Sequence, residues 1–305
     1  QANGLESIDE VLAGMGEVGP HSGRPLTTED VVRDWAVAMV LQDSGVAGGK
    51  YAYASYPRAP KASPQLSLSR CPSGEVPGEV NPYGFETIDI DCRGEYTLSF
   101  QGDTLARVVP AEAHGGSHMV WSNRGDQADM TLTRSFDLRG LSGPIEFSYW
   151  TWFDIEEGWD YAYLSASLDQ GVTWQVLALP SGTVWDPYGN SYGQGYTGLS
   201  GGGSESQWIR EAVDLSQFAG QQVTLRFEYV TDAAVNGEGI LLDDLALPAL
   251  GYREGFEQGE GGWEGQGFVR LYNRLPQSSR VVLAIRREEW EIEELTLDAD
   301  RRAEA

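Results

Sequence analysis

Seven segments between residues 115 and 250 alternate apolar and polar side chains with a period of about two, and no helical pattern interrupts them. They span residues 129–138, 144–155, 160–169, 173–179, 207–215, 221–230 and 239–247. Such alternation is typical of β-strands, and most of the connections between the segments carry Gly, Asp or Asn. A series of strands without intervening helices predicts an antiparallel β-sandwich or jelly roll, and therefore a mainly β chain.

The two ends of the chain follow other patterns. Helical spacing predicts one helix over 5–16 and a second over 27–43, which begins at a Thr cap and early acidic residues. Strand-like patterns return on both sides of the jelly roll, and we predict that they form one smaller, discontinuous β-sandwich. The resulting scheme is a helical segment over 1–58, a linker over 59–82, a small β-sandwich from 83–110 and 266–305, and a jelly-roll domain over 115–262.

The composition limits the kinds of partner. The chain has 46 acidic and 21 basic residues, a formal charge of −25, which argues against nucleic acid and anionic membranes as partners. No run of 18 or more apolar residues exists, so we predict no membrane insertion. An excess of acidic residues is consistent with a secreted protein and with cation binding. An acidic surface without either role accounts for the charge equally well.

Two cysteines, Cys71 and Cys92, lie in turn-rich sequence and form no CxxC motif. We predict that they form one disulfide, which implies an oxidising, extracellular location. The first residues show neither the pattern of a signal peptide nor an initiator Met. We therefore expect a processed or truncated piece of a longer secreted protein.

Catalytic motifs are not found in the sequence. It lacks HExxH, and His114 and His118 in "HGGSH" are separated by residues that disfavour the helix a zinc pair needs. The segment "GGGSES" does not fit a nucleophile elbow, because no helix follows it. We predict no catalytic residues and expect no activity from this piece alone.

Acidic residues gather at the ends of the predicted strands. The segments "SNRGDQADM", "DIEEGWD" and "VTDAAVNGEG" each carry several oxygen ligands, and Asp243 and Asp244 are adjacent within one strand. Calcium takes six to eight oxygen ligands, many of them from loops, and a buried carboxylate needs a partner. The candidate calcium ligands are Asp243, Asp244, Asp126, Asp129, Asp160 and Glu238. The alternative is that these acids are solvated, or that one of the paired aspartates binds an Arg or backbone N–H groups.

One connection, residues 180–207, is about 28 residues long and rich in Gly, Tyr and Trp. Loops of this length without secondary structure are uncommon and are often functional or mobile. Its possible ligand-binding residues are Trp185, Tyr188, Tyr192 and Tyr196. They suggest an aromatic platform for sugar or peptide, with core and loop packing as the alternative.

Several long blocks resemble a known family. They read "SHMVWSNRGDQADMTLTRSFDL", "SYWTWFDIEEGWDYAYLSASLDQGVTW", "PYGNSYGQGYTG" and "LRFEYVTDAAVNGEGILLDDLAL", and "GFEQGEGGWEGQGFVRLYNRLPQ" continues them. They closely resemble the region after the catalytic domain in secreted bacterial metallopeptidases of the immune inhibitor A family. The segments "GLESIDEVL" and "EDVVRDWAVAMVLQD" look like the helical tail that completes the protease domain of that family.

The resemblance implies a zinc-dependent endopeptidase whose HExxH part is absent here, so no zinc ligand is carried over and zinc belongs only to the missing catalytic part. It also implies calcium as a structural cofactor of the β-region, with Asp243 or Asp244 as the leading ligand. The primary hypothesis is a non-catalytic C-terminal region whose calcium-stabilised jelly roll supports its own protease domain or another extracellular protein, or positions substrate. The alternatives are a secreted module that binds carbohydrate or glycoprotein, and an extracellular structural or surface-assembly protein.

Overall fold

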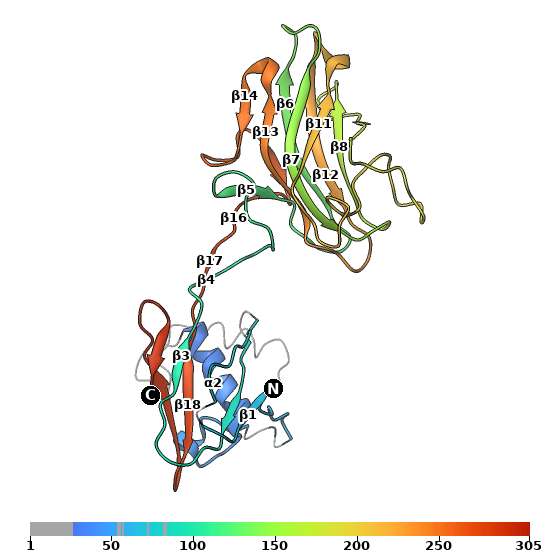
Figure 1. Cartoon of the computed structure of the whole chain (residues 1–305). Coiled ribbons are helices and arrows are strands. Elements are labelled where there is room, and N and C mark those ends of the chain that lie inside the picture. Colours follow the sequence, from blue (N-terminus) through green and yellow to red (C-terminus); the bar gives the residue numbers. More distant parts are fainter. Residues whose placement is uncertain (1–26, 54–55, 57, 72, 82–83) are drawn as a thin grey trace. The chain divides into compact units, whose positions relative to one another are not determined.

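The computed structural model describes residues 27–305 except 54–55, 57, 72 and 82–83 (Figure 1). The helix predicted over 5–16 lies outside the described residues. The chain divides into two compact units, with unit 1 formed by the chain up to Thr104 together with Gln277–Ala305, and unit 2 formed by Leu105–Pro276. Residues 105–110 and 266–276, which the sequence assigned to the smaller sandwich, thus belong to unit 2. No helix in the described part of the chain is long and apolar enough to cross a membrane.

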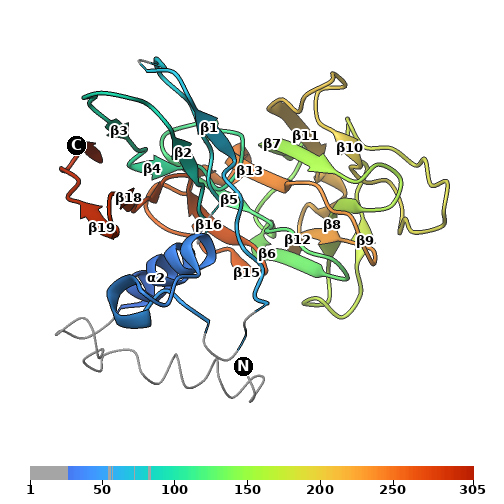
Figure 2. The ribbon, with the colours of Figure 1, turned by 90° about the horizontal axis from the view of Figure 1, so that it is seen from below.

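Unit 2 is an antiparallel β-sandwich, which confirms the predicted mainly β class. Its larger sheet has the order β10-β7-β13-β5-β16, with β11 paired to β7 and β14 to β13, and its second sheet has the order β15-β6-β12-β8-β9. Figure 2 shows the two sets of strands as separate layers. The strands are β5 His118–Trp121, β6 Asp129–Asp137, β7 Glu146–Ile155, β8 Tyr161–Ser167, β9 Gln175–Val176, β10 Gly198–Leu199, β11 Ile209–Asp214, β12 Gln222–Val230, β13 Gly239–Leu247, β14 Tyr252–Glu254, β15 Glu264–Gln266 and β16 Val269–Tyr272. A short pair, β4 Leu105–Ala106 and β17 Leu275–Pro276, and the 3-10 turns Ser216–Phe218 and Pro248–Leu250 complete the unit.

The alternation seen in the sequence places one face of each long strand in the core between the sheets. Phe147, Tyr149 and Phe153 of β7 face Leu225 and Phe227 of β12 there. Strand β12 pairs with β6 from Gln222–Asp137 to Val230–Asp129, so the register is continuous along the whole ladder. All seven segments predicted between residues 115 and 250 contain strands, which confirms them.

The outer face of the larger sheet is covered as well. Trp152 of β7 and Leu241 of β13 pack with Val109, Met119 and Trp121 in a second buried cluster. The bulky residues on both faces of 144–155 therefore reflect a central strand that is covered on both sides.

The described residues of unit 1 are built around helix α2 Thr28–Leu41, which confirms the second predicted helix. Thr27 forms a capping box with Asp30, which satisfies backbone N–H groups at the N-terminus of the helix. Val37, Ala38 and Leu41 pack against Val282 and Ile292 of a hairpin, among other residues. The remaining elements are a 3-10 turn at Val46–Gly49, β1 Leu66–Leu68, β2 Ile88–Ile90, β3 Ser99–Gln101, β18 Val281–Arg286, β19 Trp290–Leu295 and β20 Arg302–Glu304.

Ion pairs and a disulfide tie unit 1 together. Asp30 is almost fully buried and lies 3.0 Å from Arg280, which also contacts Glu294. The predicted Cys71–Cys92 disulfide is present, and it lies beside the parallel pair of β1 and β2. The helix and the C-terminal hairpin thus form one packed body although 240 or more residues separate them.

Candidate metal centre

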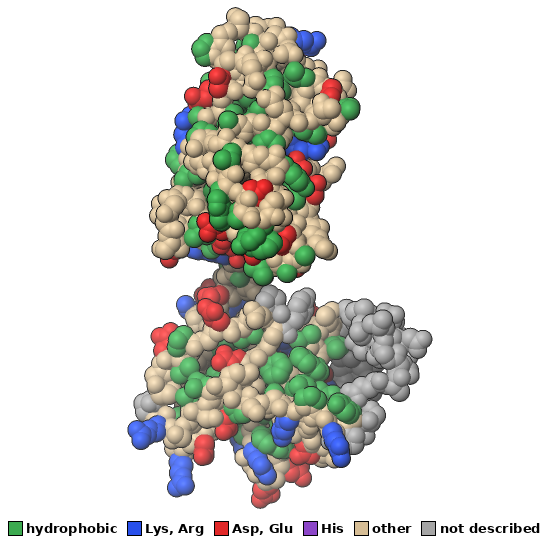
Figure 3. Space-filling model, turned by 90° about the vertical axis from the view of Figure 1, so that its right-hand side faces the viewer, with side chains coloured by type: hydrophobic (Ala, Val, Ile, Leu, Met, Phe, Trp, Pro, Cys, Tyr) green, Lys and Arg blue, Asp and Glu red, His purple; other side chains and the backbone are tan. Residues whose placement is uncertain are grey.

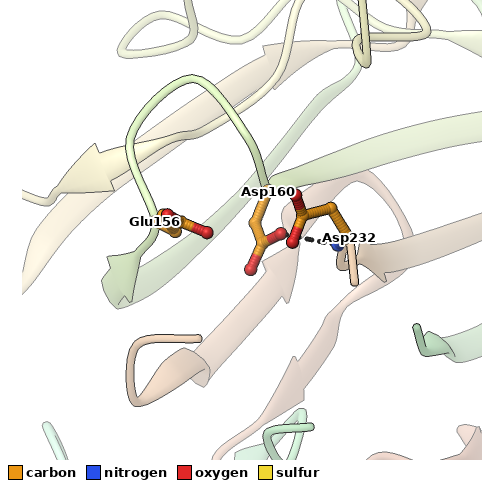
Figure 4. Close-up of side chains that lie close together, drawn as sticks. All are labelled: Glu156, Asp160 and Asp232. Carbon is orange, nitrogen blue, oxygen red and sulfur yellow. Dashed lines mark hydrogen bonds between the residues drawn. The ribbon is translucent and has the colours of Figure 1, made fainter. Parts of the chain in front are cut away.

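Three carboxylates meet at one end of the sandwich of unit 2. Glu156 directly follows β7, Asp160 directly precedes β8, and Asp232 lies two residues after β12. One ligand oxygen from each lies within 4.8 Å of the others. Figure 4 shows the Glu156 side chain pointing toward Asp160 and Asp232. The neighbouring positions of β8 and β12 in one sheet bring these distant residues together.

The turn between β7 and β8 carries two of the three residues, and hydrogen bonds fix its backbone. The backbone N–H of Asp160 donates to the carbonyl of Glu156 at 3.1 Å, and Thr197 Oγ donates to the same carbonyl. Gly158, whose φ of +78° suits a residue without Cβ, donates its N–H to Thr197 at 2.8 Å. These bonds hold the backbone of Glu156 and Asp160 so that both residues lie at the same end of the sandwich.

The carboxylates have few partners within the protein. Asp160 is fully buried and accepts hydrogen bonds from Asp232 N–H at 2.8 Å and from the Tyr229 hydroxyl at 3.4 Å. Glu156 Oε2 is buried without a hydrogen-bond partner among the described residues. No salt bridge to these three carboxylates occurs in the described part of the chain, so no Lys, Arg or His compensates their charge.

This arrangement raises the pKa of both Asp160 and Glu156. Burial raises the pKa of Asp160 to about 6, and the charges of Asp232 and Glu156 act in the same direction. Burial, together with the charges of Asp232 and Asp126, also raises the pKa of Glu156. Carboxylates that repel one another and lack a cationic partner form a favourable site for a bound cation.

Asp126 extends the cluster from the loop between β5 and β6. Its charge acts on Glu156, and its Oδ1 accepts a hydrogen bond from the Asn236 side chain at 2.6 Å. The Gln127 N–H donates to the Asp232 carbonyl, which links this loop to the segment after β12. The three clustered carboxylates, with the charge of Asp126 nearby, offer the hard oxygen ligands that Ca²⁺ prefers.

The paired aspartates of β13 lie outside this cluster. Asp243 is fully buried and accepts hydrogen bonds from the N–H groups of Gly115 at 2.9 Å and Asp244 at 2.7 Å. Asp244 lies at a β-bulge with a φ of +48°, is exposed, and contacts His114 Nδ1 at 2.6 Å. The backbone N–H alternative considered for this pair thus describes Asp243, and the pair fastens residues 114–115 to β13.

Asp243→Asn is expected to destabilise unit 2, and more so in acid than at neutral pH. Asn has one oxygen for two N–H donors, and a buried donor without a partner costs about 1–3 kcal/mol. Burial raises the pKa of Asp243 to about 6, so between pH 4 and 6 the folded protein retains a proton that the unfolded chain releases. The stability that Asp243 contributes is therefore largest below pH 4 and declines as the pH rises through 6.

Urea unfolding of both proteins at pH 4.5 and 7.5, with EDTA present, measures this difference. The loss caused by the substitution should be larger at pH 4.5 by on the order of 2 kcal/mol. A loss that is equal at the two pH values would show that Asp243 does not hold its proton in the folded state.

The structure places the other candidate ligands separately. Asp129 is exposed at the start of β6 and contributes to the raised pKa of Glu228. Glu238 forms a salt bridge with Arg124 at 2.6 Å. Of the six candidate calcium ligands, Asp160 belongs to the cluster, and Asp126 lies near enough for its charge to act on Glu156. Glu156 and Asp232, which the sequence segments contain, complete the cluster.

The aromatic residues of the long loop divide into two groups. Trp185, Tyr188 and Tyr192 are exposed, whereas Tyr196 is 1% exposed and its hydroxyl bonds that of Tyr149 at 2.8 Å. Tyr196 is therefore a core residue and lies out of reach of a ligand at the surface. Trp159, in the turn between β7 and β8, joins the exposed group. Its ring stacks on that of Tyr188 with 3.8 Å between the ring centroids.

The chain matches one protein family and is similar to several known bacterial proteins. Residues 97–272 match the family described as Immune inhibitor A-like, MAM domain. The chain is 31% identical over 189 residues to the pre-pro-metalloprotease PrtV of Vibrio cholerae, an alignment that covers 61% of this chain and 19% of PrtV. It is 30% identical over 137 residues to immune inhibitor A of Bacillus thuringiensis (45% of this chain, 18% of that protein) and 26% identical over 170 residues to bacillopeptidase F of Bacillus subtilis (55% and 10%). The matched regions thus span about a fifth or less of these relatives.

Proposed function

The chain belongs to the immune inhibitor A-like metallopeptidase family, and we propose that it is a secreted, non-catalytic β-region whose unit 2 is stabilised by calcium. The disulfide of unit 1 supports an extracellular location, because such bonds persist in oxidising surroundings. The role we propose is that of a rigid body that supports a protease domain or positions its substrate.

The buried, unpartnered Oε2 of Glu156 carries the calcium proposal. A carboxylate oxygen that is removed from water and given no donor is destabilising unless a cation binds it. Asp160 and Asp232 lie within reach of the same ion, and all three offer hard oxygen ligands. The arrangement contains no Cys or His, so it suits calcium better than zinc.

Adding calcium to metal-free protein is expected to raise the melting temperature of unit 2. A ligand at 100 times its dissociation constant stabilises the folded state by about 2.7 kcal/mol, which corresponds to roughly 5–10 °C for a unit of this size. Differential scanning calorimetry with EDTA and with calcium measures this shift, and magnesium at the same concentration serves as the control. Equal melting temperatures in EDTA and in calcium would refute the proposed site.

A further inference from the structure

We propose that unit 2 binds an uncharged polysaccharide on an exposed aromatic surface beside the acidic cluster. We name this the aromatic surface and define it by Trp159, Trp185, Tyr188 and Tyr192. It combines the turn between β7 and β8 with the long loop over 180–207.

The exposure of these four side chains is the first observation. Trp159 is 37% exposed, Trp185 50%, Tyr188 55% and Tyr192 66%, whereas the aromatic residues of the sandwich core are buried. Trp159 and Tyr188 stack at 3.8 Å with their planes 14° apart, and Gly158 packs against Trp185. Tyr192 is four residues from Tyr188 in the same loop, and its ring stacks on that of Tyr163 with 5.6 Å between the centroids. Single exposed apolar residues are common, but neighbouring exposed rings such as those of Trp159 and Tyr188 mark an interaction site.

The loop that carries the rings is held in place by hydrogen bonds. Asp186 Oδ1 accepts the N–H groups of Gly189 and Asn190, and the Asn190 side chain donates to the Trp159 carbonyl at 3.2 Å. The hydroxyl of Tyr161 donates to the Trp185 carbonyl at 2.9 Å. A surface that is ordered before binding loses little conformational entropy when a ligand arrives.

Charge narrows the class of ligand. No Lys, Arg or His occurs between residues 140 and 209, a stretch that holds eight acidic residues. Figure 3 views the side of the molecule that carries the long loop, and hydrophobic side chains gather there with acidic ones among them. This stretch therefore supplies no basic side chain that could pair with an anionic polymer. Asp186 Oδ1 already accepts two backbone N–H groups, which makes a strongly cationic partner the weaker fit for the long loop.

The chemistry of the rings favours sugar over peptide. A pyranose presents flat C–H faces that stack on aromatic rings, and its hydroxyls at the ring edge need polar neighbours. Tyr and Trp combine an apolar body with a polar tip, and the exposed Tyr188 and Tyr192 supply hydroxyls that can bond those of a sugar. The surface therefore offers both kinds of contact that a neutral polysaccharide requires.

Affinity gel electrophoresis tests the proposal with six soluble neutral polysaccharides: β-1,3-glucan, β-1,4-glucan, α-1,4-glucan, xylan, mannan and glycol chitin. Calcium is present throughout, so that the outcome is independent of whether the metal site is real. At least one polysaccharide should retard the protein, and Tyr188→Ala and Tyr192→Ala should each weaken the affinity about tenfold. Trp35→Ala is the matched control, because Trp35 is 46% exposed on unit 1 and lies outside the aromatic surface.

Circular dichroism melting of each variant separates loss of binding from loss of folding. The Tyr variants should melt within about 2 °C of the wild type, because their side chains are exposed. Absence of retardation by all six polysaccharides would overturn the proposal, and so would retardation that the Tyr variants leave unchanged. Binding of a lysine-rich peptide that 0.5 M NaCl abolishes, without any polysaccharide binding, would assign the surface to a cationic peptide instead.

Discussion

Trp263→Ala is expected to lower the free energy of unfolding of unit 2 by about 3–5 kcal/mol, the usual result of removing a large buried aromatic side chain. Trp263 lies in the segment between β14 and β15, beyond the last long strand, yet it is only 2% exposed. Its ring lies 6.0 Å from that of Phe136 and 5.7 Å from that of Phe227, on two strands of the second sheet. Its Nε1 donates to the Tyr252 hydroxyl at 2.9 Å, so the substitution also removes a hydrogen bond.

Trp185→Ala is the matched control, because it removes the same side chain from an exposed position in the long loop. Chemical unfolding of the two variants in calcium should show a large loss for Trp263→Ala and at most about 1 kcal/mol for Trp185→Ala. The melting temperature of the Trp263 variant should fall by roughly 10 °C. Similar losses for both variants would contradict the finding that the core of unit 2 extends past residue 262.

The strands were predictable because each long strand buries one face, so its period of two is present in the local sequence. Strand β13, predicted over 239–247, has these same bounds in the structure. The bulge at Asp244 was not predictable in this way, since a single residue with positive φ leaves the alternation on either side intact. That bulge turns Asp244 outward and leaves Asp243 buried, and so decides which of the two needs backbone donors.

Contacts between distant segments were harder to foresee than the segments themselves. Capping residues in the sequence identified α2, but nothing local to residues 27–43 indicates that Arg33 pairs with Glu294. The disulfide was predictable because two cysteines allow one pairing. Residues 269–272 pair with β5, which lies far away in the sequence. No hairpin turn joins the two strands, so nothing local in the sequence specifies the register of their pairing.

The acidic cluster, too, could be predicted only in part, because one of its residues comes from a distant segment. The segment "EEGWD" brings Glu156 and Asp160 into one short turn, and this spacing was a usable signal. Asp232 is 72 residues away from Asp160 and joins them only because β12 pairs with β8 in the second sheet. An alternation pattern predicts that a strand exists but leaves its neighbour open, so the third ligand could not be chosen from the sequence.

Asp160→Asn is expected to abolish the stabilisation by calcium, so that the wild type is the more stable protein only when calcium is present. Asn retains an oxygen that accepts the Asp232 N–H, so the hydrogen bond that shapes the site survives. Without calcium, the variant no longer places a buried negative charge beside Glu156 and Asp232, and it should unfold at the same or a higher temperature than the wild type. With calcium at 100 times its dissociation constant, the wild type gains about 2.7 kcal/mol and the variant gains almost nothing.

Melting curves of both proteins in EDTA and in calcium give the four melting temperatures that test this expectation. Asp129→Asn is the matched control. Asp129 is an exposed aspartate at the start of β6, so its variant should keep the full response to calcium. If Asp160→Asn kept that response and Asp129→Asn lost it, the metal would bind at the start of β6 and the cluster would be a purely repulsive feature. A calcium site at the cluster predicts that Asp160→Asn loses the response to calcium, whereas a site at the start of β6 predicts that Asp129→Asn loses it. The comparison therefore shows where the cation binds as well as that it binds.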